Sequence, residues 1–424
     1  MPILIKNGRI IDPARGLDEA RDIYIEGERI SEVPKNGGSG KGVEVIDAAG
    51  KLVVPGLIDM HCHLREPGFE YKENIASGTR AAAAGGFTTV CCMPNTSPVN
   101  DNRSVTEFIL KQAESAGYCR VIPVGAVTKG SAGAELAEIG DMAGAGCRAF
   151  SDDGKPVTNA EMMRRALEYA KTFGVTIISH CEDTALSAGG VMNEGPVSTR
   201  LGLRGIPAAA EEVMVARDIA LARLTGGRLH IAHVSTEGSV RLVRQAKAEG
   251  LNVTAETCPH YFTLTDEAVL AYNTNLKVNP PLRTERDREA ITEGLADGTI
   301  DVIATDHAPH AASEKEVEFD LAPFGISGFE TALALSLRLS KPGRLSLIEL
   351  IAKLTVNPAK ALGLAVPSLA PGSPADVTII DPAAAWTVDP MKFLSRGRNT
   401  AFAGMEMRGA AAETVVGGRR IAAR

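Results

Sequence analysis

Residues 54–68 read VPGLIDMHCHLREPG, an apolar run that leads into two histidines and an arginine. Leu57–Met60 has the length and composition of a strand, and His61 and His63 stand at its end. Side chains two positions apart on a strand project to the same face, so both imidazoles can reach one metal ion while Cys62 points away. The segment therefore predicts a buried strand that carries metal ligands at its carboxyl end.

Apolar runs of the same kind recur along the middle of the chain and alternate with helical segments. The strand-like runs begin near Leu57, Thr88, Cys119, Cys147, Val175, Arg228, Asn252 and Asp301. The helical segments have apolar residues on one face and include Ser104–Ala116, Ala160–Phe173, Ala209–Leu224 and Glu285–Ala296. Eight such units in about 300 residues predict an α/β fold, a (β/α)8 TIM-like barrel, with a doubly wound open sheet as the alternative.

The two ends of the chain differ from the middle, because both read as short strands separated by turns. Asn7-Gly8 and Glu26-Gly27 separate the first strands, and residues 375–381 and 413–421 repeat the pattern. Since the termini of compact folds are commonly close together, we expect one small β-sandwich domain from residues 1–54 and 367–424. The catalytic barrel would then span residues 55–366.

Composition restricts the class of function. The chain has a net charge of −7, and 44% of its residues are hydrophobic. Scattered lysines and arginines argue against nucleic acid and anionic membranes as partners, which favours a small-molecule substrate. The 7 cysteines form no C-x-x-C pair, and we find no apolar signal or spanning segment, so we expect a cytoplasmic protein without disulfides.

Further candidate ligands close other predicted strands in the same way as His61 and His63. They are Asp153, His180, His233 and Asp306. The carboxyl ends of barrel strands meet at one mouth, where such folds place their chemistry. Imidazoles with carboxylates and no thiolate suit Zn²⁺ with open positions. A barrel enzyme without a metal is the alternative.

Three other histidines have a structural interpretation. His230 lies three residues before His233, hence on the opposite face of its strand, and His307 has opposite parity to Asp306. We expect both to pack in the core or against helices. For His260, at another strand end, a supporting place behind the metal ligands and a structural one stay open.

Three motifs together resemble the dihydroorotase family. They are residues 54–68, residues 89–98 (TVCCMPNTSP) and residues 304–310 (ATDHAPH), and the resemblance extends over essentially the whole chain. It implies the reversible cyclisation of N-carbamoyl-L-aspartate to L-dihydroorotate in pyrimidine biosynthesis. The alternatives are a hydantoinase or allantoinase, and an inactive scaffold for aspartate carbamoyltransferase.

The resemblance also implies roles for individual residues. His61, His63 and Asp306 would hold a first Zn²⁺, and His180 and His233 a second, with Asp153 bridging the two. Many relatives bridge with a carboxylated lysine, so Lys155 is the alternative to Asp153. Asp306 would be the catalytic base, and the substrate contacts would be Arg65, Asn95, Asn279, His310 and the backbone at Phe324 and Gly325.

Some features stay open at this stage. Residues 311–319 are charged and non-periodic, which fits a lid over the substrate or a solvated loop. The resemblance allows a homodimer and a complex with aspartate carbamoyltransferase. The sequence does not decide between one and two metal ions.

Overall fold

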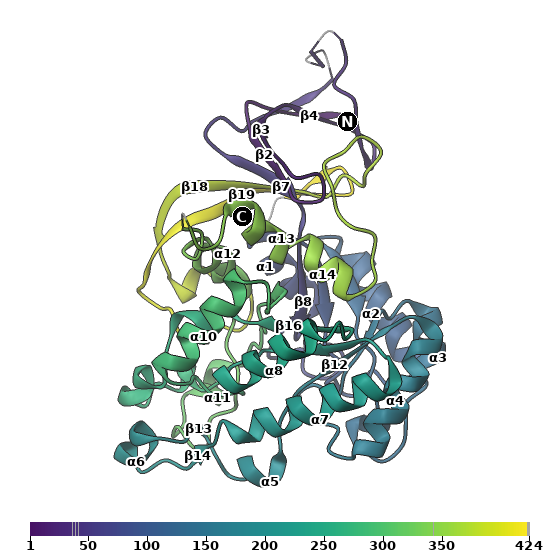
Figure 1. Ribbon diagram of the computed structural model, residues 1–424. Helices are drawn as coiled ribbons and strands as arrows, with labels where there is room; N and C mark the ends of the chain where they lie inside the picture. Colours follow the sequence, from purple (N-terminus) through teal and green to yellow (C-terminus); the bar gives the residue numbers. More distant parts are fainter. Residues whose placement is uncertain (36, 39, 41, 342, 422–424) are drawn as a thin grey trace.

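The computed structural model describes residues 1–421 except 36, 39, 41 and 342, and its largest part is a barrel (Figure 1). Among the described residues, eight strands that run parallel to their neighbours form its wall. They are β8 (Leu57–Cys62), β9 (Phe87–Cys92), β10 (Arg120–Pro123), β11 (Ala149–Phe150), β12 (Thr176–Ser179), β15 (Leu229–Ile231), β16 (Val253–Thr257) and β17 (Val302–Ile303). The predicted (β/α)8 fold class is confirmed, and the open sheet is wrong.

Two short bridges close the barrel between its laddered parts. Gly125 pairs with Phe150, which joins β10 to β11, and Cys62 pairs with His307, which joins the last strand to the first. Asp59 on β8 strengthens this last junction, because its carboxylate accepts the backbone N–H of Thr305 at 2.9 Å and the hydroxyl at 2.6 Å. The strand carrying His61 is thereby fixed beside the one that leads to Asp306.

Helices cover the outside of the barrel. They are α1 (Ile75–Ala84), α2 (Arg103–Ala116), α3 (Ile139–Ala145), α4 (Ala160–Phe173), α7 (Ala209–Thr225), α8 (Glu237–Ala248), α10 (Glu285–Ala296), α12 (Phe329–Leu337), α13 (Leu347–Lys353) and α14 (Val356–Ala361). The bounds of α4 match the prediction because both ends are capped: the Asn159 side chain accepts two backbone N–H groups, and Gly174 adopts a left-handed conformation.

Short elements extend the loops at the carboxyl ends of the strands. After β12 come α5 (Thr184–Ser187), β13 (Met192–Asn193), α6 (Pro196–Leu201) and β14 (Gly205–Ile206). The later loops contain α9 (Pro259–Thr263), 3-10 turns at 266–271 and 274–276, and α11 (Ala312–Lys315). These elements lie at the bottom of Figure 1, where they surround the barrel mouth.

The two ends of the chain meet in two sheets above the barrel (Figure 1). One sheet has the order β5-β4-β1-β6 and the other β20-β19-β18-β7-β2-β3. The strands are β1 (Ile3–Lys6), β2 (Arg9–Asp12), β3 (Leu17–Ala20), β4 (Ile23–Glu26), β5 (Arg29–Ser31), β6 (Glu44–Asp47), β7 (Leu52–Pro55), β18 (Val377–Thr387), β19 (Glu406–Val416) and β20 (Arg419–Arg420). Strand β7 pairs with β18, so both termini build one layer.

Apolar side chains from both sheets form a core of their own, separate from that of the barrel. It contains Ile5, Ile25, Val53, Val377 and Val415, all nearly inaccessible to solvent. The C-terminal segment also returns to the barrel, since Met407 and Phe402 belong to the barrel's larger core. The predicted domain boundaries at 54/55 and 366/367 stay a prediction, and residues 422–424 of the predicted β domain lie outside the described residues.

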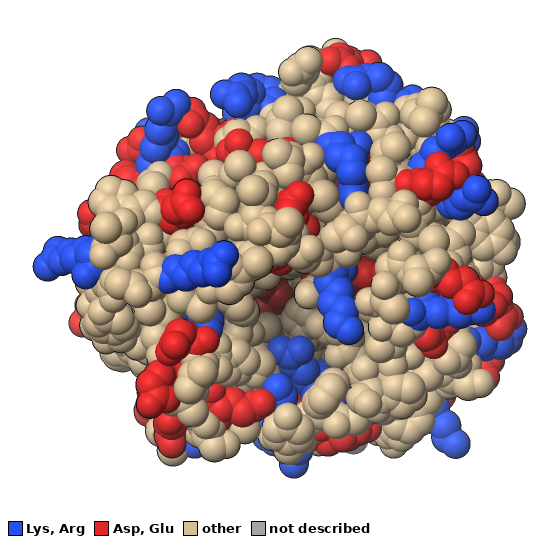
Figure 2. Space-filling model, turned by 90° about the horizontal axis from the view of Figure 1, so that it is seen from below, with Lys and Arg blue, Asp and Glu red and all other residues tan. Residues whose placement is uncertain are grey.

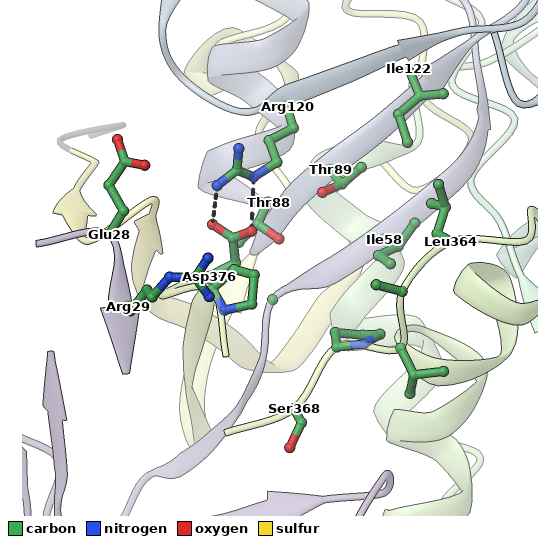
Figure 3. A pocket seen from close by; sticks show the side chains of 15 residues that line it. Glu28, Arg29, Ile58, Thr88, Thr89, Arg120, Ile122, Leu364, Ser368 and Asp376 are labelled. Atoms are coloured by element: carbon green, nitrogen blue, oxygen red, sulfur yellow. Dashed lines mark hydrogen bonds and ion pairs between the residues drawn. The ribbon is translucent and has the colours of Figure 1, made fainter. Parts of the chain in front are cut away.

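A cavity of about 400 Å³ lies between this β domain and the barrel (Figure 3). Its barrel wall comes from the amino ends of β8, β9 and β10, including Ile58, Thr88 and Arg120, so it is at the opposite end from the predicted site residues. Arg120 forms an ion pair with Asp376 at 2.9 Å inside it. Two of the charges of its lining thus compensate each other within the protein.

Residues 311–324, called the flap below, begin with the short helix α11 and are anchored by two buried side chains. Lys315 is buried, and its ammonium group donates to the carbonyl oxygens of Thr274 at 3.1 Å and Pro323 at 2.7 Å. Phe319 is also buried, and the Lys277 ammonium lies 5.7 Å from the centre of its ring. These two side chains anchor a segment that is otherwise mostly exposed, so the lid and the solvated loop both stay predictions.

Two further expectations concern the whole chain. All 7 cysteines are free and buried, which confirms the expected absence of disulfides. Among the described residues, no helix has the length and apolar character needed to cross a membrane.

Replacing Thr305 tests the junction between the first and last barrel strands. Thr305→Val removes the hydroxyl and leaves a buried carboxylate oxygen of Asp59 without its donor, so we expect a loss of about 2 kcal/mol in the free energy of unfolding. Thr305→Ser keeps the hydroxyl and should lose under about 1 kcal/mol. Urea unfolding compares the two variants, and a Val variant as stable as the Ser variant would contradict the assignment.

Burial of Lys315 predicts a pH effect on stability. Burial, with the nearby charge of Lys277, lowers the pKa of Lys315 to about 7. Between pH 7 and 10 the unfolded chain keeps a proton that the native state has lost, so this group makes stability rise with pH, by at most about 1.4 kcal/mol per unit. The stability difference between wild type and Lys315→Met should therefore change over this range in urea titrations. Parallel pH profiles would show that Lys315 keeps an ordinary pKa.

Candidate metal centre

The six predicted ligands converge at the carboxyl ends of five barrel strands. The Nε2 atoms of His61 and His63 lie 3.5 and 3.1 Å from the same oxygen of Asp306. On the other side, Nδ1 of His180 lies 2.8 Å from Nε2 of His233. The structure thus brings together side chains that are up to 245 residues apart, although their roles as ligands remain a proposal.

Asp153 lies at the centre of this cluster. One of its oxygens is 3.4 Å from Nε2 of His61 and 3.5 Å from the facing nitrogens of His180 and His233. Its other oxygen is 3.5 Å from Nε2 of His63. Such contacts with both histidine pairs fit a bridging carboxylate.

The alternative bridging residue, Lys155, has a different position. Its side chain is exposed, in a turn closed by its backbone N–H and the carbonyl of Asp152 at 2.8 Å. The neighbouring Asp152 is buried and accepts the backbone N–H groups of Val127 and Thr128, which fixes the segment that presents Asp153. The geometry therefore favours Asp153 over Lys155.

The donor set fits a bound cation. Nε2 of His61 and Oδ1 of Asp153 are buried and face each other, yet among the described residues neither has a hydrogen-bond partner. Buried polar groups are nearly always paired, so unpaired groups that converge indicate a missing ligand. Imidazole nitrogens and carboxylate oxygens are ligands that Zn²⁺ accepts.

Electrostatics supports the same conclusion. Burial opposes a positive charge on His180, but its contacts with Asp153 and Glu182 outweigh this and raise its pKa to about 10. Burial likewise opposes a positive charge on His61. The carboxylates of Asp153 and Glu256 outweigh this effect and raise the pKa of His61 well above its usual value. Carboxylates that stabilise a proton on these rings also stabilise a metal ion in its place.

Two carboxylates, Glu256 buried and Glu182 partly exposed, stand behind the predicted ligands, and the sequence analysis missed both. Glu256 on β16 lies 2.5 Å from Nδ1 of His61, and Glu182 lies 2.9 Å from Nε2 of His180. Carboxylates in this position orient a ligand imidazole and make it a stronger donor. A glutamate within the apolar strand 253–257, and one two residues beyond His180, are signals that could have revealed them.

The other histidines occupy supporting places. His307 stacks on Phe329 with ring centres 4.0 Å apart, which confirms its packing role. His230 is buried as expected, and its Nε2 lies 3.3 Å from Glu256, so it also belongs to the polar network behind His61. His260 is buried within 4.8 Å of Asp306, and burial lowers its pKa to about 4.

The predicted substrate contacts border the cluster. Asn95 lies 2.9 Å from Nδ1 of His63 through its side-chain oxygen, and Arg65 donates to the carbonyl of Pro309 at 3.2 Å. Nε2 of His310 lies 2.8 Å from the carbonyl oxygen of Phe324. These contacts place Arg65, Asn95 and His310 around one side of the cluster.

The contacts predicted for the ring amides have protein partners in this structure. The Asn279 amide donates to Glu182 at 2.9 Å, which is also the partner of His180. The backbone N–H of Gly325 donates to the carbonyl of Lys277 at 2.9 Å, and its carbonyl accepts from Asn399 at 3.0 Å. Their roles toward a substrate remain predictions.

Backbone conformation also marks the site. Of the six non-glycine residues with positive φ among the described residues, three are predicted site residues: Arg65 at 63°, His233 at 31° and Asp306 at 45°. Such conformations cost free energy and persist where the surroundings impose them, which often occurs at functional sites.

The face of the molecule at this end is hollowed. Figure 2 views the molecule from below and shows a hollow with Lys and Arg atoms at its edge and Asp and Glu atoms inside it. Charged side chains of both signs therefore gather at this hollow.

Comparisons with known proteins agree on the family. A family model described as Dihydro-orotase-like matches residues 50–239. Proteins named dihydroorotase from Syntrophotalea carbinolica and Pelotomaculum thermopropionicum are 61% and 60% identical, over 99% of this chain and 98% of their own. One from Geobacter metallireducens is 58% identical over 99% of both chains.

Solved structures match the whole fold as well. The L-hydantoinase of Arthrobacter aurescens superposes with a TM-score of 0.86 at 26% identity, covering 99% of this chain and 96% of its own. A D-hydantoinase from a Thermus species gives 0.80 at 27% identity, covering 99% and 94%. The whole fold, with its barrel and its two sheets, is thus shared with proteins named hydantoinase.

Removing the carboxylate behind His61 should weaken metal binding. In Glu256→Gln we expect the affinity for Zn²⁺ to fall by about 10- to 100-fold, because the imidazole loses its charged partner. Competition with a chromophoric chelator measures this. Glu211→Gln is a matched control, since Glu211 is an equally buried carboxylate bound by Ser235. An equal loss of affinity in both variants would contradict the specific role of Glu256.

Proposed function

The chain belongs to the dihydroorotase family, and from this premise we propose that it cyclises N-carbamoyl-L-aspartate reversibly to L-dihydroorotate and water in de novo pyrimidine biosynthesis. One observation carries the substrate assignment: a guanidinium group stands beside the predicted metal ligands. The charges of Asp306 and Asp153 both act on the Arg65 guanidinium, which supports this assignment. A planar guanidinium suits the carboxylate that both substrates carry.

We propose two Zn²⁺ ions in this centre. His61, His63 and Asp306 would hold one, His180 and His233 the other, and Asp153 would contact both. Zinc bound there polarises a carbonyl group and lowers the pKa of water toward about 7. The unpaired buried atoms of His61 and Asp153 support this set of ligands.

Asp306 is the proposed general base. Burial acts to raise its pKa, but His63 and His61 outweigh this effect and keep the carboxylate ionised at neutral pH. In ring opening it would take a proton from the attacking water and deliver it to the amide nitrogen that leaves. In ring closure the same proton would travel in the reverse direction.

The remaining contacts would orient the substrate. Arg65, Asn95 and His310 would hold the carboxylate that is not consumed. Asn279 and the backbone at Phe324 and Gly325 would face the ring amides. The 2.9 Å contact between Asn95 and His63 supports this arrangement, because it joins the carboxylate site to a metal ligand.

Two alternatives are less well supported. A hydantoinase or allantoinase shares the fold, but its substrates lack the carboxylate that Arg65 would bind. An inactive scaffold for aspartate carbamoyltransferase would have no need of the six ionisable side chains that converge here.

Family membership is the basis for two further proposals, a homodimer and a complex with aspartate carbamoyltransferase. Light scattering of the chain, alone and mixed with that enzyme, tests both. A cytoplasmic location suits the free thiols.

Assays in both directions test the proposed function. We expect turnover of N-carbamoyl-L-aspartate and L-dihydroorotate, and at least about 100-fold lower kcat/KM for allantoin and dihydrouracil, because these leave Arg65 unpaired. Chelation should abolish activity and Zn²⁺ should restore it. Better turnover of dihydrouracil than of L-dihydroorotate would favour the hydantoinase alternative.

Asp306→Asn tests the general base. We expect kcat to fall by about 1,000-fold or more, since an amide cannot take the proton. Asp301→Asn is the control, because Asp301 lies just before the amino end of the same strand. Metal content of both variants should be measured alongside. Near-normal turnover by Asp306→Asn would remove Asp306 from the mechanism.

A further inference from the structure

An ion pair closes one edge of the predicted carboxylate site. The Lys72 ammonium lies 2.7 Å from a carboxylate oxygen of Glu314, which belongs to α11 in the flap. It also lies 3.4 Å from Nδ1 of His310. The side chains of Lys72 and Glu314 are only 15% and 26% exposed, so this pair is part of the wall and not a surface ion pair.

The protonation of His310 follows from its contacts. Its Nε2 lies 2.8 Å from the carbonyl oxygen of Phe324, which can only accept, so Nε2 carries the proton. Nδ1 then carries a lone pair, which accepts a hydrogen bond from the Lys72 ammonium. Burial, together with the charges of Arg65, Lys315 and Lys72, lowers the pKa of His310 to about 2. In this state the one N–H of His310 is engaged by Phe324 and must leave it to reach a substrate carboxylate, whereas the Lys72 ammonium, with three N–H groups, has a donor to spare beside Glu314 and His310.

The carboxylates near Arg65 all have partners within the protein, and Glu314 is the one held by another side-chain cation of this wall. Asp306, Asp153, Glu314 and Glu73 all act on its charge. The first two belong to the metal cluster, and Glu73 accepts from the Ser395 hydroxyl at 2.5 Å and the Arg396 backbone at 3.2 Å. Glu314 is held by Lys72 and comes within 3.6 Å of Nδ1 of His310. Its ion pair with Lys72 is therefore the contact that a substrate carboxylate could take over.

We propose that Lys72 is a further contact for the substrate carboxylate, and that Glu314 is an internal carboxylate that occupies Lys72 until the substrate displaces it. The proposal rests on the proposed function, because it concerns the carboxylate of that substrate. Lys72 is suited to such an exchange, since its ammonium ends a flexible four-carbon chain. The rings of Phe69 and Tyr71, with centres 5.7 and 5.5 Å from Nζ, stabilise the cation beside the site.

This exchange would contribute to specificity. A substrate with a carboxylate replaces the bond between Lys72 and Glu314 with an equivalent one. A hydantoin or dihydrouracil ring cannot, so it gains nothing from Lys72. The cation therefore selects acidic rings on a barrel that closely resembles those of hydantoinases.

The test compares Lys72→Met with Lys72→Arg. We expect Lys72→Met to raise KM for L-dihydroorotate and N-carbamoyl-L-aspartate by about 10- to 100-fold, because a charged hydrogen bond is lost. Its kcat should stay within about threefold, since Lys72 contacts no predicted metal ligand side chain in the described structure. Lys72→Arg should keep KM within about threefold, because it retains the charge. The inhibition constant of dihydrouracil, which lacks the carboxylate, should not change.

Lys247→Met is the matched control. It breaks the ion pair between Lys247 and Asp301, whose charged atoms are 2.6 Å apart. The two side chains are 24% and 22% exposed, and the pair lies at the opposite end of the barrel. It should lower thermal stability about as much as Lys72→Met does, without a change in KM. A KM for Lys72→Met within twofold of wild type would overturn the proposal. So would an equal rise in KM and in the dihydrouracil inhibition constant, which would indicate a distorted pocket.

Glu314→Gln tests the second half of the proposal. Removal of the competing charge should lower KM severalfold, and Lys72→Met combined with Glu314→Gln should show the KM of Lys72→Met alone. If Glu314→Gln raises KM as much as Lys72→Met does, the ion pair has a structural role, and the proposed exchange is wrong. If the wild-type protein turns over neither substrate, the proposed function fails and this proposal with it. If only the variants behave differently from expectation, the proposed function stands.

Discussion

The burial of charge at the barrel mouth is the constraint on which the rest of the structure depends. Asp153 and Asp306 are nearly inaccessible to solvent and are surrounded by four imidazoles. Ionised groups are costly to bury unless partners compensate them, and here the partners face one another with atoms left unpaired. A metal ion held between them would resolve this conflict, and the proposed chemistry and the stability of the barrel mouth would then have the same physical basis.

The second layer of the site determines how firmly the first is held. Glu256 and Glu182 hold His61 and His180 from behind, and Asp59 fixes the strand of His61 to that of Asp306. The C-terminal segment also contacts this region, because the side-chain oxygen of Asn399 accepts the backbone N–H of His310 at 3.0 Å. The C-terminal segment therefore helps to position His310, one of the proposed substrate contacts.

Much of the fold could be predicted from the sequence, because local patterns specify it. Strand starts were placed within two residues, as for Cys147 and β11, and α4 was correct at both ends because Asn159 and Gly174 are explicit caps. The convergence of the six candidate ligands followed from the geometry of parallel barrels. What could not be predicted depends on contacts between distant segments: Lys315 reaches carbonyls at 274 and 323, and Asn399 meets a residue 89 positions away.

The most direct test of this account is the anomalous scattering of zinc in crystals of the protein grown with Zn²⁺. The account predicts two peaks that share Asp153, one beside His61, His63 and Asp306 and the other beside His180 and His233. Strong zinc peaks only at other positions, with none within coordination distance of Asp153, would contradict it.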